Sequence, residues 1–390
     1  MITKLLFWAC AWLVAYVYFV YPLLVWVLSA LLGSRSALMG GTPSVCLLIA
    51  AHNEAAVVGA KIHNALSLDY PAEKLTIAVA SDGSSDETAA IVRALADEEA
   101  TGRIRLFDFA QNRGKIGALN EAIQAIDSEI VAFSDASTLL AADSIRRLAE
   151  HFADSHVGAV SGVYRVLKKD EAGLGRQEDF YWKYETFLKV CEANIGAFTG
   201  AHGSLYAIRR ILYPFPAAGT INDDFIIPMR IEQKGYRIAY EPAAVAYEEA
   251  QEMEGFARRV RIMAGNIEQL REMRELIWPL RPVSLLCLLS HKLGRLLVPA
   301  ALLLMLLASG LLWAEPLYRW FFLAQLGFYL VALLGAFVRL RPAFLRLPYY
   351  FCMINSAFFA WIYHAVRLGR LVPSRVELDG IGNQTSGGSS

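Results

Sequence analysis

Long apolar runs at both ends of the chain constrain its fold more than any other feature. Residues 5–33 contain no charged side chain, and about 20 apolar residues are enough for a helix to cross a bilayer. We therefore expect a transmembrane helix within residues 1–34. A cleaved signal peptide is the alternative, but the run is long, its basic flank is only Lys4, and it lacks a small-residue cleavage site.

The C-terminal third predicts three more spans within residues 294–370. The apolar runs are Leu296–Trp313, Trp320–Val338 and Tyr349–Val366. Residues 276–293 are also apolar, but they carry two prolines and the pair His291–Lys292, which favours an interfacial helix along the headgroups over a further span. Residues 371–390 form a small, polar tail that we expect to be disordered.

Basic residues flank several of these runs, so the orientation in the membrane stays open. If the middle of the chain is cytoplasmic, four spans place the basic residues 367–375 outside. Either the last apolar run does not cross fully, or the positive-inside bias is broken there. We expect a multi-pass protein of a bacterial-type inner membrane with its middle domain in the cytoplasm.

Charge and cysteine content exclude two classes of function. The formal net charge is +0, and no basic stripe is interleaved with aromatic residues, so we expect no nucleic-acid partner. The 5 cysteines are scattered without a CxxC pair, which indicates neither a disulfide framework nor a zinc site.

The middle of the chain has the pattern of an α/β domain. Short β-branched runs alternate with helical patterns over residues 42–250, with strands expected at residues 44–50, 75–80, 103–109 and 129–135. Ser84 or Ser85 is expected to cap the helix after the second strand. Ligands gather at the carboxyl ends of such strands, and three of these ends carry an acid, Asp82, Asp108 and Asp135. Each acid alone is as well explained as a helix cap.

Six segments together are more specific than any one of them. They are AHNEA (51–55), SDGSSDET (81–88), NRGKIGALN (112–120), FSDAST (133–138), TGAHGSLYAIRR (199–210) and NDDFIIPMRIEQKGY (222–236). In order and spacing they resemble the signature segments of glycosyltransferase family 2, most of all its membrane-embedded synthases of hyaluronan, chitin oligomers, poly-N-acetylglucosamine and cellulose. The resemblance implies an α/β catalytic domain of GT-A type, Rossmann-like with a mostly parallel sheet, within residues 35–275 and between transmembrane helices.

The first segments match the donor-binding part of that family. The resemblance implies that Asn53, Glu54 and Asp82 recognise the uridine of a UDP-sugar, since a carboxylate accepts from the pyrimidine N–H. Ser81 replaces the first acid of the DDGS form that is frequent in the family. Lys115 follows Gly114 and is expected to approach the nucleotide or its diphosphate; a solvated surface lysine is the alternative.

FSDAST matches the family's DxD metal motif with one departure. Asp135 matches its first carboxylate, whereas Ser137 stands at the third position. The resemblance implies Mg²⁺ or Mn²⁺, hard cations that prefer oxygen ligands and that bridge diphosphate oxygens. A hydroxyl is a weaker ligand than a carboxylate, so a metal held by Asp135 and Ser137 depends more on the diphosphate.

The acceptor side rests on the last two segments. Asp223 and Asp224 match the family's acidic pair, and Asp224 is the expected base that takes the proton from the acceptor hydroxyl, whose oxygen attacks the anomeric carbon in line and inverts it. Asp223, Gly200, His202 and Gly203 are expected to line the acceptor site. Helix capping by Asn222 or Asp223, and packing by His202, are the alternatives.

Processive members of the family carry a QxxRW segment, from which this chain departs. Arg261 matches its arginine, Arg258 stands where glutamine would be, and Ile262 stands where tryptophan would be. We expect Arg258 and Arg261 at the donor diphosphate; a basic cluster facing the membrane is the alternative for Arg258 and Arg259. Loss of the indole removes a stacking platform and makes long-chain processivity questionable.

These expectations describe a membrane-bound inverting glycosyltransferase that transfers a sugar from a UDP-sugar, UDP-N-acetylglucosamine or UDP-glucose by resemblance, to a glycan acceptor in exopolysaccharide synthesis. Ile262 favours the alternative of a single transfer to a membrane lipid or a polyprenyl phosphate-linked sugar. Four spans make a thin channel wall, so a homo-oligomer or a partner subunit is expected for a polymer. A transporter or nucleotide sensor is disfavoured, because transporters place polar groups inside their spans.

Overall fold

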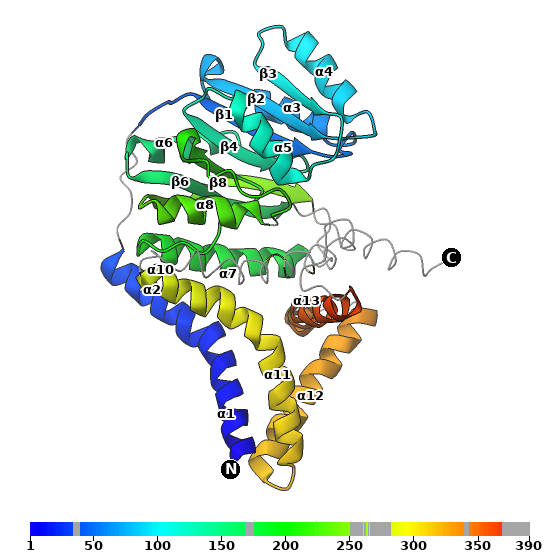
Figure 1. Cartoon of the computed structure of the whole chain (residues 1–390). Coiled ribbons are helices and arrows are strands. Elements are labelled where there is room, and N and C mark those ends of the chain that lie inside the picture. Colours follow the sequence, from blue (N-terminus) through cyan, green and yellow to red (C-terminus); the bar gives the residue numbers. More distant parts are fainter. Residues whose placement is uncertain are drawn as a thin grey trace.

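The computed structural model describes residues 1–33, 40–167, 175–220, 222–249, 260, 263, 265, 282–338 and 343–368. A layered α/β domain lies at one end of the molecule, and long helices extend from it and converge at the other end, where the N-terminus lies (Figure 1). The long helix α7 (Gly175–Asn194) lies between the two parts. The sheet and the membrane-type helices therefore meet along α7.

The sheet has eight strands in the order β3-β2-β1-β4-β7-β6-β8-β5. Pairing is parallel between β2 and β3, β1 and β2, β1 and β4, and β6 and β8, and antiparallel elsewhere. The strands are β1 (Val45–Ala51), β2 (Leu75–Asp82), β3 (Ile104–Phe109), β4 (Ile130–Asp135), β5 (Leu139–Leu140), β6 (Val157–Leu167), β7 (Tyr206–Arg209) and β8 (Arg237–Glu249). The four strands expected from the sequence are all present, so a mixed and mostly parallel α/β fold is confirmed.

Helices cover both faces of the sheet because strand side chains alternate between the faces. Leu47 and Ile49 of β1 pack in one core with Val58 of α3 (Val58–Leu66). Cys46 and Leu48, one residue out of phase, pack in the other core with Ile116 of α5 (Lys115–Ala122). The remaining helices of this domain include α4 (Thr88–Glu99), α6 (Ser144–Glu150) and α8 (Asp223–Gln233).

Three helices among the described residues are long and apolar enough to cross a membrane: Ile2–Leu32, Pro282–Leu311 and Pro316–Phe337. The first joins α1 (Ile2–Ala15) to α2 (Tyr21–Leu32) through the π-helical turn η1 (Tyr16–Val20). The second joins α10 (Pro282–Cys287) to α11 (Gly294–Leu311) through the π-helical turn η6 (Leu288–Leu293). The third is α12. These helices support membrane association.

The C-terminal segments differ in one respect from the expected division of the chain. From Pro282 onward, the segment expected to be an interfacial helix continues without a break into the following span. The last apolar run forms α13 (Leu347–Leu368), which contacts α12, α11 and α7. It lies at the end of the long helices that faces the sheet domain (Figure 1). A fourth crossing of the membrane therefore stays a prediction.

Candidate active site

The carboxyl end of β2 is held in a tight turn by its acid and the following glycine. Asp82 is buried, and its Oδ1 accepts a hydrogen bond of 2.7 Å from the backbone N–H of Arg113. Gly83 has φ +62°, and a Cβ there would lie 2.4 Å from the backbone nitrogen of Asn112. Only glycine fits such a backbone position. Asp82 and Gly83 thus hold Asn112 and Arg113 against the end of β2, shortly before Lys115 in the chain.

The loop after β1 is tied to the same turn. Asn53 has φ +57°, and its Oδ1 accepts a hydrogen bond of 2.8 Å from the backbone N–H of Ser85. The backbone N–H of Glu54 donates to Thr88 Oγ1 at 2.8 Å. The side chain of Asn53 therefore joins the two loops expected to bind the base.

The helix cap at this turn corrects one sequence-based expectation. Neither Ser84 nor Ser85 caps α4 through its side chain. Asp86 Oδ1 instead accepts from the backbone N–H of Thr88 at 3.0 Å, and Asp86 Oδ2 accepts from the backbone N–H of Ala55 at 3.0 Å. The two oxygens of the Asp86 carboxylate thus bond one backbone N–H each, at the start of α4 and in the loop after β1.

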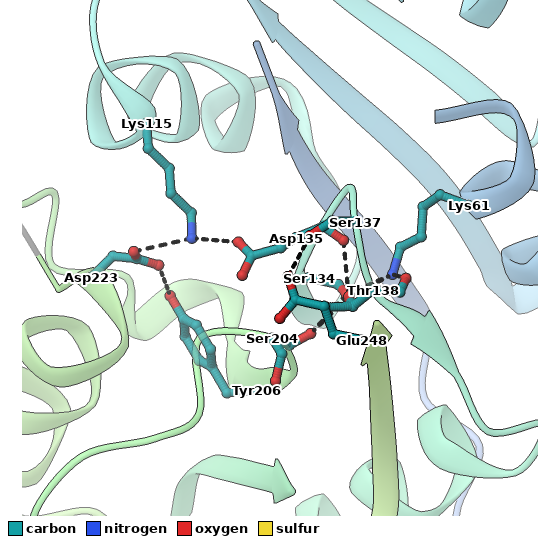
Figure 2. Close-up of polar contacts among 10 residues, drawn as sticks. All are labelled: Lys61, Lys115, Ser134, Asp135, Ser137, Thr138, Ser204, Tyr206, Asp223 and Glu248. Carbon is teal, nitrogen blue, oxygen red and sulfur yellow. Dashed lines mark hydrogen bonds and ion pairs between the residues drawn. The ribbon is translucent and has the colours of Figure 1, made fainter. Parts of the chain in front are cut away.

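Lys115 joins two acids that are far apart in the sequence (Figure 2). Its Nζ lies 2.9 Å from Asp135 Oδ1, at the end of β4, and 3.2 Å from Asp223 Oδ1, at the start of α8. Burial opposes the charge of Lys115, but Asp135 and Asp223 outweigh it and raise the pKa of the lysine above its usual value. The expected metal-binding and acceptor-binding acids therefore meet around one ammonium group.

Asp223 is fixed from its other side by Tyr206. The Tyr206 hydroxyl donates to Asp223 Oδ2 at 2.9 Å, and its ring stacks on Phe133 with a centroid distance of 4.7 Å. Burial and the charge of Asp223 raise the pKa of Tyr206 well above its usual value. The hydroxyl thus stays protonated and keeps Asp223 in place.

Asp224 lies next to Gly203 in a different environment. A Cβ at residue 203 would lie 3.4 Å from Asp224 Oδ2, so glycine leaves room beside the carboxylate. Burial, and next the charge of Asp223, raise the pKa of Asp224, while Lys189, Lys292 and Lys115 oppose the rise. A carboxylate whose pKa is raised is a stronger proton acceptor than an ordinary aspartate.

The glycine-containing loop beneath Asp224 is held by α7 and α8. The backbone N–H of Ala201 donates to the Asp224 carbonyl at 2.9 Å, and Lys189 Nζ donates to the Ala201 carbonyl at 3.3 Å. Gly200 has φ +139°, a conformation that favours glycine. Lys292 Nζ lies 3.3 Å from the centroid of the Phe225 ring, so a membrane-type helix reaches the residue next to Asp224.

His202 points into the protein interior. Its side chain is buried, with ring centroids 5.3 Å from Trp182 and 5.7 Å from Tyr240. Burial, and then Lys189, lower its pKa well below the usual value, so the imidazole is neutral. These ring contacts agree with a packing role, and contact of His202 with an acceptor stays a prediction.

Ser137 lies beside an acid that the sequence analysis did not single out. Its Oγ donates to Glu248 Oε1 at 3.0 Å, near the end of β8 (Figure 2). Asp135, Ser137 and Glu248 are hard oxygen donors of the kind that Mg²⁺ and Mn²⁺ prefer. The described residues contain no group of three or more His, Cys, Asp or Glu side chains placed to hold a metal, so diphosphate oxygens and water would complete the shell.

A buried lysine supports the turn after β4 (Figure 2). Lys61 Nζ donates to Ser134 Oγ and to the Thr138 carbonyl, both at 2.7 Å, and is completely buried. Ser134 Oγ in turn donates to the Ser204 carbonyl at 2.8 Å. Lys61 therefore fixes the residues on both sides of Asp135 and Ser137.

A polar cluster joins the sheet domain to the membrane-type helices. His291 lies with Nδ1 2.7 Å from Glu192 Oε1 and Nε2 3.0 Å from Glu185 Oε1. Glu192 also accepts from the hydroxyl of Tyr21, and Glu185 from Arg295. Burial works against ionisation of Glu185, but Arg295 and His291 hold its pKa well below the usual range. The cluster links the first helix, α7 and the Pro282–Leu311 helix.

Arg258 and Arg261 lie outside the described residues. Between them, Val260 is buried against Ala357 and Trp361 of α13. A Cβ at Gly265 would lie 2.6 Å from the side-chain nitrogen of Asn222, the residue before the acidic pair. Val260 therefore contacts α13, and Gly265 contacts the residue before Asp223.

The structure thus gathers Asp82, Lys115, Asp135, Asp223 and Asp224 along one edge of the domain, while Asn53 and Glu54 lie in the adjoining loops. Sequence reasoning missed Lys61, Tyr206 and Glu248. Glu248 lies near the carboxyl end of a strand, the same kind of position that singled out Asp135. Lys61 and Tyr206 gave no such signal, since they lie inside an amphipathic helix and a strand.

The family profile described as "Glycosyltransferase like family 2" matches residues 43–265. The poly-beta-1,6-N-acetyl-D-glucosamine synthase of Staphylococcus aureus is 28% identical over 233 residues, which are 58% of this chain and 55% of that protein. The beta-monoglucosyldiacylglycerol synthase of Synechocystis sp. is 35% identical over 118 residues, which are 30% of this chain and 25% of that protein. The chain thus spans about half the length of the poly-beta-1,6-N-acetyl-D-glucosamine synthase that it matches.

Among solved structures, the mannosyltransferase PcManGT from Pyrobaculum calidifontis, in complex with GDP-Man and Mn²⁺, is similar with a TM-score of 0.70 and 25% identity. The similarity covers 91% of this chain and 97% of that one, so it includes the membrane-type helices. The predicted GT-A type fold is confirmed. Since the profile covers more than half of the residues, the chain belongs to glycosyltransferase family 2.

Proposed function

We propose that the protein is an inverting, divalent-metal-dependent hexosyltransferase that moves a sugar from a nucleoside diphosphate sugar to an acceptor hydroxyl. The observation that carries the proposal is the bridge from Asp135 through Lys115 to Asp223, because it brings the acid expected at the metal next to the acidic pair. The mannosyltransferase similar in fold holds a nucleotide sugar and Mn²⁺.

Asp224 is the base in this proposal. Its carboxylate takes the proton from the acceptor hydroxyl, and the oxygen then displaces the nucleoside diphosphate from the anomeric carbon. Its raised pKa suits proton abstraction, and Gly203 leaves room for a sugar ring beside it. Tyr206 and Lys115 hold the carboxyl group of Asp223 in place, so that Asp223 bonds a second hydroxyl of the acceptor.

The donor end uses cations and the turn after β2. Lys115 lies where it balances negative charge near Asp135, and Arg258 and Arg261 are proposed to bind the diphosphate. Asp135 would hold Mg²⁺ or Mn²⁺, which when bound neutralises charge on the leaving diphosphate. Asn53, Glu54 and Asp82 are proposed to bind the base. A UDP-sugar is the first choice, and GDP-mannose, the ligand named with the mannosyltransferase, is the second.

The acceptor is proposed to be a glycan in exopolysaccharide synthesis, supported by the similarity to the poly-N-acetylglucosamine synthase. A single transfer to a membrane lipid is the second candidate. It is favoured by the contact of Lys292, on a membrane-type helix, with Phe225 beside Asp224. In both cases the acceptor reaches Asp224 close to the membrane surface.

The test supplies radiolabelled donors one at a time to the full chain in nanodiscs with Mn²⁺, and then separates products by size and by solvent extraction. We expect Asp224→Asn to lower kcat by about 10²- to 10⁴-fold. Asp127→Asn is the matched control, because Asp127 is exposed before β4, at the opposite edge of the sheet. A large water-soluble product supports the glycan acceptor, and one labelled sugar per extracted lipid supports the lipid. Transfer that does not depend on Asp224 would overturn its role.

A further inference from the structure

Glu248 reaches the metal-binding turn through the pairing of two strands. The short strand β5 follows this turn, and Leu139 pairs antiparallel with Tyr247 of β8. Since antiparallel neighbours run past each other, the residues before Leu139 lie alongside those after Tyr247. This register places Ser137 next to Glu248.

The direction of β8 also brings Glu248 to the edge where the other acids lie. β8 is parallel to β6, which is antiparallel to β7, and β7 is antiparallel to β4. β8 therefore runs in the same direction as β4, and its carboxyl end lies at the same edge of the sheet as Asp135. Figure 2 shows both carboxylates beside Ser137, on different strands.

The hydrogen bond between Ser137 and Glu248 defines their roles. A hydroxyl that donates to a carboxylate oxygen orients that carboxylate, and it is itself a weak ligand. On the other side of the turn, Asp135 Oδ1 accepts from Lys115 at 2.9 Å. Both acids are half-buried, so each keeps contact with the site while its direction is fixed by a neighbour.

We propose that Glu248 binds the divalent cation together with Asp135, and that Ser137 is the residue that positions Glu248. The second acid of the metal site then comes from β8 instead of from residue 137. Two carboxylates with diphosphate oxygens and water form a usual shell for Mg²⁺. The inference rests on the proposed function, because the nucleotide supplies the remaining ligands.

The test measures Mn²⁺ binding and not turnover. The electron paramagnetic resonance signal of free Mn²⁺ is titrated with the detergent-solubilised full chain, without nucleotide, with UDP and with GDP. We expect Glu248→Gln to weaken Mn²⁺ binding in the presence of nucleotide by about 10- to 100-fold. Glu73→Gln is the matched control, because Glu73 is exposed before β2, at the opposite edge of the sheet.

Two further variants separate ligation from a general effect of charge. Glu248→Asp keeps the charge but withdraws it by one methylene, so we expect weaker Mn²⁺ binding than in the wild type. In the double variant Ser137→Asp with Glu248→Gln, the acid moves to the turn, and we expect affinity to recover to within about threefold of the wild type. Glu248→Asp also serves as the test if Glu248→Gln does not fold. Affinity within twofold of the wild type for Glu248→Gln, or for Glu248→Asp, would overturn the inference.

A failure of the proposed function gives a different result. Asp135→Asn removes the acid on which the proposed metal site itself depends. If Asp135→Asn and Glu248→Gln both leave Mn²⁺ binding unchanged, the proposed metal site is wrong and the inference with it. If Asp135→Asn abolishes binding and Glu248→Gln does not weaken it, only the role of Glu248 is wrong.

Discussion

Lys61 makes the stability of the sheet domain depend on pH in a way that can be calculated. Burial lowers its pKa from 10.5 to about 7, although the charge of Asp135 partly opposes this effect. At about 1.4 kcal/mol for each pKa unit, the difference corresponds to about 5 kcal/mol against the charged form in the folded chain. The side chain is completely buried, so solvent screening does not reduce this figure.

The direction of this pH dependence follows from the number of protons that each state binds. Because the folded-state pKa is lowered, the unfolded chain binds more protons than the folded chain between pH 7 and pH 10.5, and stability rises with pH in that range. From pH 6 to pH 9 the contribution of Lys61 to the free energy of unfolding rises by about 3 kcal/mol. A Lys61→Met variant has no titrating group at this position and lacks this rise.

The assay compares wild type and Lys61→Met by guanidinium unfolding of the full chain in detergent and metal-free buffer, followed by tryptophan fluorescence. Other titrating groups largely cancel in the difference between the two proteins. We expect this difference to change by about 3 kcal/mol in favour of the wild type from pH 6 to pH 9. A difference that stays constant within 1 kcal/mol would refute the reasoning, since Lys61 would then keep its ordinary pKa.

Three further predictions concern the acidic pair and its neighbours. Gly203→Ala places a methyl group 3.4 Å from Asp224 Oδ2, so we expect a folded protein whose acceptor KM rises about tenfold while nucleotide binding is unchanged; weaker nucleotide binding would contradict this. Tyr206→Phe removes the hydrogen bond to Asp223 and should lower the free energy of unfolding by about 2 kcal/mol, measured by thermal denaturation. An unchanged Tm would mean that this bond does not stabilise the fold. Asp224 acts in its deprotonated form, and its pKa is raised. On acidification, kcat should therefore begin to fall at a pH above about 4, the usual pKa of an aspartate. A fall in kcat only at or below this pH would argue for another base.

The strands and the acids at their ends could be predicted because both depend on local sequence. The β1, β2 and β4 runs are apolar on both faces, and Asp82 and Asp135 follow them directly. The edge rule for parallel sheets then places these acids together. The Asp223–Asp224 pair, at the start of α8, was instead identified by its match to the acidic pair of glycosyltransferase family 2.

Features that depend on pairing between distant segments could not be predicted. The approach of Glu248 to Ser137 depends on the register of a two-residue strand, and the bridge through Lys115 depends on how α5 and α8 face each other. His291 and Lys292 suggested a helix at the membrane surface, because their partners are on other elements. His291 lies between the carboxyl groups of Glu185 and Glu192, and Lys292 contacts the ring of Phe225.

The two π-helical turns lie in contact with each other. Tyr16, at the start of η1, hydrogen-bonds Ser290 of η6 at 2.8 Å, and a Cβ at Gly294 would lie 2.8 Å from Val17. Each turn widens its helix at one place only, and an α-helix repeats every 5.4 Å along its axis. The two helices therefore pack together in a single axial alignment, in which the two π-helical turns face each other. Lys292 contacts Phe225, the residue next to Asp224, and Lys189 of α7 bonds the loop beneath it. The same alignment therefore sets the position of Asp224 relative to the two membrane-type helices.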